Sequence, residues 1–243
     1  MCFEYVSKKE YQPIKNELIE MINKVQDKVR DKFTFRYDFV GSSKRNMITR
    51  NPKSNIGFDF DVNIMVNDDD KEYSPSQIKH ILMKAFDEFN EVPRRYDYSR
   101  DTTRVFTIKL RDVENLRTVH SFDFAIAYDC KNGKYQYIHH NKTQNTYSWE
   151  DQPKSENNLL KKEDLIKKNR RWNEVRELYL KKKNRNTDVN KKSRSIYVET
   201  INEIYNNRRL NTVREPSLKS KNMNNNKRSR LTVEAINEMR YYL

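Results

Sequence analysis

The chain has 243 residues, a length that allows one large domain or two small ones and enough apolar residues for a buried core. Its 49 Lys and Arg residues against 35 Asp and Glu residues give a net charge of +14, which favours nucleic acids and nucleotides as partners over cationic ligands. With three glycines and two cysteines that form no C-x-x-C pair, the sequence excludes a Walker or dinucleotide phosphate loop and a cysteine zinc site.

The N-terminal part predicts a helix followed by a strand. Ser7 and Glu10 form a capping box, and apolar residues then recur at helical spacing as far as Val29. From Phe33 the apolar period changes to two, which is typical of a strand. This strand runs directly into the small turn Gly41-Ser42-Ser43.

A strand-helix-strand pattern follows. Ser74 and Pro75 begin a second helix, with the proline at the first helical position. Asn132-Gly133 predicts a two-residue hairpin turn, so the sheet should be mixed. The remaining strands are predicted at residues 58–66, 106–110, 119–128 and 135–138.

Beyond Asn141 the sequence predicts a polar connection through Glu156 and then helices. One apolar stripe joins Leu165, Trp172, Val175 and Tyr179, and a second joins Ile196, Ile201 and Ile204. We therefore expect an α+β protein with a mixed sheet flanked by helices in residues 1–150 and a basic helical lobe in residues 151–243. Residues 211–230, rich in Asn, Lys, Ser and Arg, are predicted to form a mobile arm.

Three acidic residues lie in otherwise apolar strands. Asp59 and Asp61 flank Phe60, so a strand directs both carboxylates to one face and Phe60 to the other. Asp123 alternates in the same way with apolar neighbours, where an unpaired acid is costly. Clustered carboxylates with oxygen-only donors suit Mg²⁺ or Mn²⁺, and two such ions neutralise charge during phosphoryl transfer.

The turn Gly41-Ser42-Ser43 follows a strand, where a glycine lets the backbone approach a phosphate. The ordered set of this turn, Asp59-Phe60-Asp61-Val62 and Phe122-Asp123-Phe124 resembles the pattern of the DNA polymerase beta-like nucleotidyltransferase superfamily. That superfamily includes poly(A) polymerases, CCA-adding enzymes, oligoadenylate synthases and bacterial cyclic-oligonucleotide synthases. The N-terminal helix and the helical second lobe resemble its oligoadenylate synthase and archaeal CCA-adding branch.

The resemblance implies a nucleotidyltransferase fold and a template-independent, two-metal transfer of a nucleoside monophosphate from an NTP. By this resemblance Asp59 and Asp61 bind both metal ions, and Asp123 binds the ion that activates the acceptor hydroxyl. The implied nucleotide-binding residues are Gly41, Ser42 and Ser43 in the turn and Lys183 and Ser195 in the helical lobe.

The acceptor remains open between RNA and another nucleotide, and the basic helical lobe is expected to bind polyanions through phosphates. Two other functions remain open: a nucleic-acid-binding module without catalysis, and nucleotidyl transfer to a small molecule, for which a basic chain is poorly suited when the acceptor is cationic. Without a long apolar run, a signal-peptide pattern or a lipidation motif, we expect a cytoplasmic protein that does not bind membranes.

Overall fold

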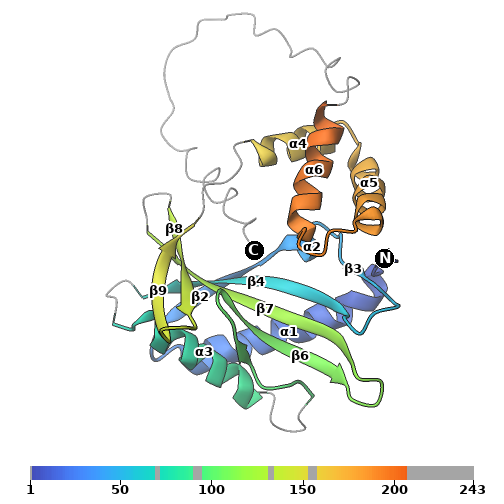
Figure 1. The fold of residues 1–243 in the computed structure, drawn as a ribbon. Helices are drawn as coiled ribbons and strands as arrows, with labels where there is room; N and C mark the ends of the chain where they lie inside the picture. Colours follow the sequence, from blue (N-terminus) through green and yellow to red (C-terminus); the bar gives the residue numbers. More distant parts are fainter. Residues whose placement is uncertain (1, 69–71, 90–94, 131–133, 153–157, 207–243) are drawn as a thin grey trace, which may run out of the picture. The chain divides into compact units, whose positions relative to one another are not determined.

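The computed structural model describes residues 2–68, 72–89, 95–130, 134–152 and 158–206 (Figure 1). These residues form two compact units. The sheet unit begins at Glu4 and contains all the strands, and the helical unit contains residues 2–3 and 158–206. The predicted arm at 211–230 and the predicted turn at Asn132-Gly133 lie outside the described residues.

The sheet unit alternates strands and helices in its first half and consists of strands in its second half. Its elements are β1 (Glu4–Tyr5), α1 (Lys8–Val29), β2 (Thr34–Val40), α2 (Gly41–Lys44), β3 (Thr49–Arg50), β4 (Phe58–Asn67), α3 (Pro75–Phe89), β5 (Arg100–Asp101), β6 (Val105–Asp112), β7 (Arg117–Asp129), β8 (Tyr135–Asn141) and β9 (Thr146–Asp151). The helix start predicted at Ser7 is confirmed, because the Ser7 side chain accepts a hydrogen bond from the Glu10 N–H. The Glu10 carboxylate, which would complete a capping box, binds Arg50.

The large sheet is mixed, as expected, and runs in the order β2-β4-β7-β6-β5. β4 and β7 are parallel, whereas β2 pairs with β4 and β6 pairs with β7 in the antiparallel sense. β8 also pairs with the C-terminal end of β7, beyond the part that pairs with β6, and carries β9 at its outer side. The central strands β4 and β7 therefore have neighbours on both sides.

Helices α1 and α3 lie together on one face of the sheet (Figure 1). The apolar residues that alternate along the central strands point to these helices and form the core. They include Phe58, Phe60, Val62 and Ile64 of β4, Phe106 and Ile108 of β6, and Phe122, Phe124 and Ile126 of β7. Because side chains alternate along a strand, the intervening residues of β4 and β7, including all three predicted acids, belong to the other face.

Two predictions on the second half of the chain were wrong. The polar connection expected from Asn141 to Glu156 contains β9, which forms a hairpin with β8. Its tip is a turn in which Asn145 has a positive φ of 51°, and such a turn is built from polar residues. Tyr147 and Trp149 pack from this strand against the core.

The single apolar stripe expected from Leu165 to Tyr179 is divided between two helices. The helical unit consists of α4 (Leu159–Lys168), α5 (Trp172–Arg185) and α6 (Ser193–Asn206). Arg170 has φ 57°, a left-handed conformation that ends α4 without glycine or proline. Val175, Tyr179, Ile196 and Ile201 are buried in this unit, and the second predicted stripe is confirmed in α6.

No helix in the part of the chain that the structure describes has both the length and the apolar character needed to cross a membrane.

Candidate active site

Four neighbouring strands place one site residue each in a single row. Val40, the last residue of β2, pairs with Asp61 of β4. Asp61 pairs with Asp123 of β7, and Asp123 pairs with Thr107 of β6. The parallel register of β4 and β7 therefore brings together two acids that lie far apart in the sequence.

The three acids predicted from the sequence converge on the sheet face opposite α1 and α3. One carboxylate oxygen from each of Asp59, Asp61 and Asp123 lies within 4.8 Å of the others. Asp59 is exposed, whereas Asp61 and Asp123 are partly buried. Three converging carboxylates form an oxygen-only donor set of the kind that binds Mg²⁺ or Mn²⁺, so these residues fit the metal that the resemblance implies.

The protein holds these acids in an environment that disfavours their charge. Burial raises the pKa of Asp61 well above its usual value, and the neighbouring carboxylates of Asp59 and Asp123 raise it further. Burial also raises the pKa of Asp123, although a hydrogen bond from Thr107 opposes this shift. Like charges in a partly dehydrated site repel one another, and a bound cation would relieve that repulsion.

The glycine of the predicted turn packs against one of the acids. Gly41 has φ +62°, a conformation that L side chains rarely adopt, and it begins the four-residue helix α2. A Cβ atom at this position would collide with the carboxylate of Asp61. The missing side chain therefore lets the end of β2 pass directly beside the acidic cluster.

The two serines of the turn have different surroundings. Ser42 is partly exposed, whereas Ser43 is buried and its hydroxyl donates to the carbonyl of Val40. The other two predicted nucleotide-binding residues belong to the helical unit. Lys183 lies in α5 with its Nζ 4.3 Å from the centre of the Phe3 ring, and Ser195 is exposed in the first part of α6.

Sequence reasoning missed Thr107. This buried residue lies in β6 with its hydroxyl 2.5 Å from Oδ1 of Asp123, to which it donates a hydrogen bond. Its only signal in the sequence is a polar residue between Phe106 and Ile108, and that signal has no meaning until the pairing of β6 with β7 is known.

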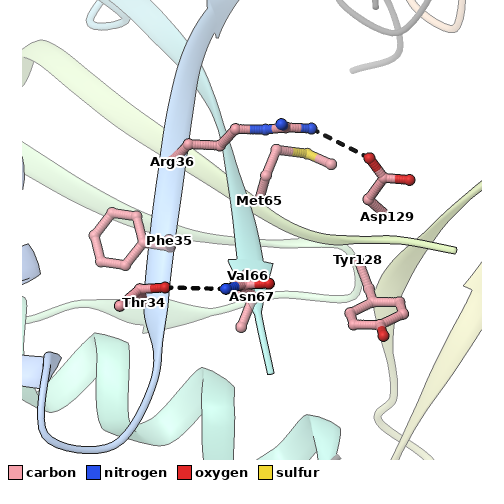
Figure 2. A pocket seen from close by; sticks show the side chains of 8 residues that line it. All are labelled: Thr34, Phe35, Arg36, Met65, Val66, Asn67, Tyr128 and Asp129. Carbon is pink, nitrogen blue, oxygen red and sulfur yellow. Dashed lines mark hydrogen bonds and ion pairs between the residues drawn. The ribbon is translucent and has the colours of Figure 1, made fainter. Parts of the chain in front are cut away.

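A pocket of 380 Å³ lies at the opposite end of the sheet, where β2 begins and β4 and β7 end (Figure 2). Arg36 reaches past Met65 to Asp129, with 3.3 Å between nitrogen and oxygen. Asn67 donates to Thr34 at 3.4 Å. Asn67 is six residues beyond Asp61 on β4, a separation of roughly 20 Å along an extended strand, so this pocket is not part of the acidic site.

Comparison of the sequence with protein-family models and with curated proteins finds no match. Comparison of the fold finds similar solved structures. One is the DncV cyclic AMP-GMP synthase of Vibrio cholerae, described as a prokaryotic cGAS homologue, with a TM-score of 0.53 and 14% identity over 83% of this chain and 52% of that one. Its form with bound 3'-deoxy ATP gives a TM-score of 0.53 and 15% identity over 88% and 55%.

The same enzyme in complex with the linear intermediate 5' pppA(3',5')pG gives a TM-score of 0.52 and 13% identity over 88% of this chain and 56% of that one. The chain thus spans about half the length of these structures. At this identity the likeness concerns the fold alone, and it confirms the expectation of an α+β nucleotidyltransferase fold with a mixed sheet flanked by helices.

Proposed function

We propose that this chain, which has the fold of the DNA polymerase beta-like nucleotidyltransferases, is a template-independent nucleotidyltransferase. It transfers a nucleoside monophosphate from an NTP to a hydroxyl group of a nucleotide or RNA acceptor. The observation that carries the proposal is the convergence of Asp59, Asp61 and Asp123 within 4.8 Å beside the Gly41 turn. The fold alone would not establish the function, because one fold can host many unrelated functions.

Asp59 and Asp61 would hold two Mg²⁺ or Mn²⁺ ions together, and Asp123 would hold the one nearer the acceptor. When bound, these ions neutralise the developing charge on the phosphoryl oxygens and make the acceptor hydroxyl more acidic. The acceptor oxygen forms a bond to the α-phosphorus and releases its proton to solvent. The bond from that phosphorus to the bridging oxygen breaks, and pyrophosphate leaves.

The turn at the end of β2 would bind the phosphate tail of the NTP. The backbone at Gly41 can approach a phosphate closely, and the partly exposed Ser42 would donate to it through its hydroxyl. The Ser43 hydroxyl already donates to Val40, so we assign Ser43 a contact through its backbone N–H. Lys183 and Ser195 would add contacts from the helical unit.

For the acceptor, two observations favour different molecules. The similar Vibrio cholerae enzyme has been solved with a linear dinucleotide intermediate, which favours a second nucleotide. The helical unit favours RNA, because basic residues outnumber acidic ones by two to one between residues 158 and 206. A cytoplasmic location would suit both acceptors and agrees with the finding that Cys2 and Cys130 form no disulfide.

The test is incubation of the full chain with each NTP, labelled on its α-phosphate, and Mg²⁺ or Mn²⁺, with and without an RNA oligomer. We expect a labelled product that disappears in a variant with both Asp59→Asn and Asp61→Asn. Labelled small molecules would identify a nucleotide acceptor, and labelled polymer would identify RNA. RNA binding without any labelled product would reject the proposal in favour of a non-catalytic module.

A further inference from the structure

The hydroxyl of Thr107 in β6 contacts the acidic cluster by a hydrogen bond. Thr107 and Asp123 are directly opposed in the antiparallel pairing of β6 and β7, so their side chains emerge on the same face at close range. The hydroxyl donates to Oδ1 of Asp123 at 2.5 Å, a length typical of a hydrogen bond to a charged carboxylate.

This bond restricts the carboxylate in two ways. Threonine is branched at Cβ, so its side chain has few rotamers, and burial of Thr107 restricts them further. A stiff donor on Oδ1 therefore restricts rotation of the Asp123 carboxylate. Because this carboxylate contributes an oxygen to the cluster with Asp59 and Asp61, the restriction acts on a candidate metal ligand.

Phe106 and Ile108, which flank Thr107, point into the core with no exposure above 1%. The strand is therefore anchored from its opposite face, and the hydroxyl cannot follow Asp123 if that side chain rotates. Around metal centres, residues that do not bind the metal often orient the ligands by hydrogen bonds, and a donor fixed in this way can do the same.

We propose that Thr107 is a positioning residue that orients Asp123 for binding of a divalent metal ion. This inference rests on the proposed function, because it assigns a role at the same acidic site. Thr107 does not contact the nucleotide or the reacting atoms in this proposal. It acts through the geometry of Asp123, so loss of its hydroxyl should weaken metal binding more than it destabilises the fold.

The decisive variants are Thr107→Val and Thr107→Ser. Valine has nearly the shape of threonine and lacks the hydroxyl, whereas serine keeps the hydroxyl and lacks the methyl group. Thr34→Val is the matched control, because it removes a hydroxyl at the other end of the same sheet, where Thr34 accepts from Asn67. Thermal unfolding without metal is first measured for the wild type and the three variants. Metal binding is then compared among the proteins that are folded at the assay temperature.

Mn²⁺ binding is measured without nucleotide, by the electron paramagnetic resonance signal of free Mn²⁺ and by calorimetry. We expect Thr107→Val to bind Mn²⁺ about 10- to 100-fold more weakly, the range typical of lost supporting contacts. Thr107→Ser should recover most of that affinity, and Thr34→Val should match the wild type. In the transfer assay, the Mn²⁺ concentration for half-maximal rate should rise in the same order.

Equal Mn²⁺ affinity in Thr107→Val and wild type would overturn the proposal. An equal loss in the valine and serine variants would also overturn it, because the hydroxyl that serine keeps would then make no difference to metal binding. Wild-type protein that binds Mn²⁺ but forms no product would reject the proposed function and leave the positioning role standing. Wild-type protein that does not bind Mn²⁺ would overturn both.

Discussion

At the scale of single residues, the metal-binding role proposed for Asp61 and the stability of the fold favour different charge states of its carboxyl group. Burial and the carboxylates of Asp59 and Asp123 raise its pKa, so without a metal the ionised form is disfavoured in the folded protein. The folded pKa exceeds the unfolded value. Stability is therefore lost as pH rises through the interval between these two values, and the charged carboxylate opposes folding at neutral pH.

We predict that Asp61→Asn raises the unfolding temperature of the metal-free protein and abolishes transfer. The amide has the same shape and removes the repulsion. It also removes a charge from the metal site, which costs several kcal/mol in the transition state, or roughly a thousandfold or more in rate. Unfolding temperature and specific activity check the two effects. Asp27→Asn, an exposed residue of α1, serves as the control and should change neither. A destabilised or active Asp61→Asn protein would contradict this account.

A second prediction at this scale concerns the stability and activity of a Gly41 variant. Gly41→Ala should lower the free energy of unfolding by about 1–2 kcal/mol, because the residue has a left-handed conformation. Activity should fall much further, since the new methyl group displaces the Asp61 carboxylate. Urea unfolding and kcat measure the two losses. Asn145→Ala also puts alanine at a left-handed position, in the turn between β8 and β9, and it removes a hydrogen bond to His140. It should reduce stability without comparable loss of activity.

At the scale of elements, the pairing of β4 with β7 begins where Phe58 meets His120. The His120 ring stacks on Phe58, with 5.7 Å between ring centres, and only 1% of the residue is exposed. Burial, with a smaller effect of Arg95, lowers the pKa of His120 to about 4. The first strand contact therefore contains a histidine that resists protonation.

We predict that the free energy of unfolding falls as pH decreases, because of this histidine. Its folded pKa of about 4 lies below the ordinary value of 6.5, so the unfolded state binds more protons between these values. Stability is intact above the unfolded pKa and falls as pH decreases toward the folded one. Between pH ~7.5 and ~5 the loss should be about 2 kcal/mol.

Urea unfolding at several pH values measures this loss, and His120→Phe should reduce the pH dependence by that amount whatever its effect on stability at neutral pH. His80→Gln is the control, because His80 is exposed, and its pH dependence should equal that of the wild type. An unchanged slope in His120→Phe would assign the acid sensitivity to other groups.

Elements with strong periodicity could be predicted from the sequence. The alternation of Asp59, Phe60 and Asp61 specified a strand, its faces and the carboxylate pair. The sequence did not predict β9, because the polar residues that form its turn are also typical of a long loop. It did not predict the break between α4 and α5, because the left-handed residue there is Arg170 and not the glycine or proline that usually ends a helix. Thr107 escaped because its role depends on the register between two strands, which no local pattern encodes.

At the scale of the whole molecule, residues 158–206 contain 14 basic and 7 acidic residues, a net charge of +7 out of +14 for the chain. Part of this basic charge forms ion pairs within the helical unit. Lys182 pairs with Glu203, Lys191 with Glu199, and Arg171 with Glu174. The basic residues that remain exposed include Lys161, Lys168 and Lys181. A partner that binds through phosphates would contact this exposed set.

We predict that RNA binding weakens steeply with salt, with a log-log slope of about −0.7 for each phosphate contacted on a single strand. Charge reversal of Lys161, Lys168 and Lys181 to Glu should lower affinity and flatten this slope. The same reversal at Lys8, Lys9 and Lys24 of α1 changes net charge equally and should have less effect. Fluorescence titration of labelled RNA at several salt concentrations distinguishes them, and equal losses would show a response to net charge alone.

The register of β4 against β7 has a consequence for errors in folding. A shift of one residue would turn Asp61 toward the helices and expose Phe60, which the core opposes strongly. A shift of two residues keeps every side chain on its own face, so burial opposes it far less. It nevertheless moves Asp61 roughly 7 Å along the sheet from Asp123. Such a molecule would keep its buried core but separate Asp61 from Asp123, so under the proposed mechanism a well-folded sample could still contain inactive protein.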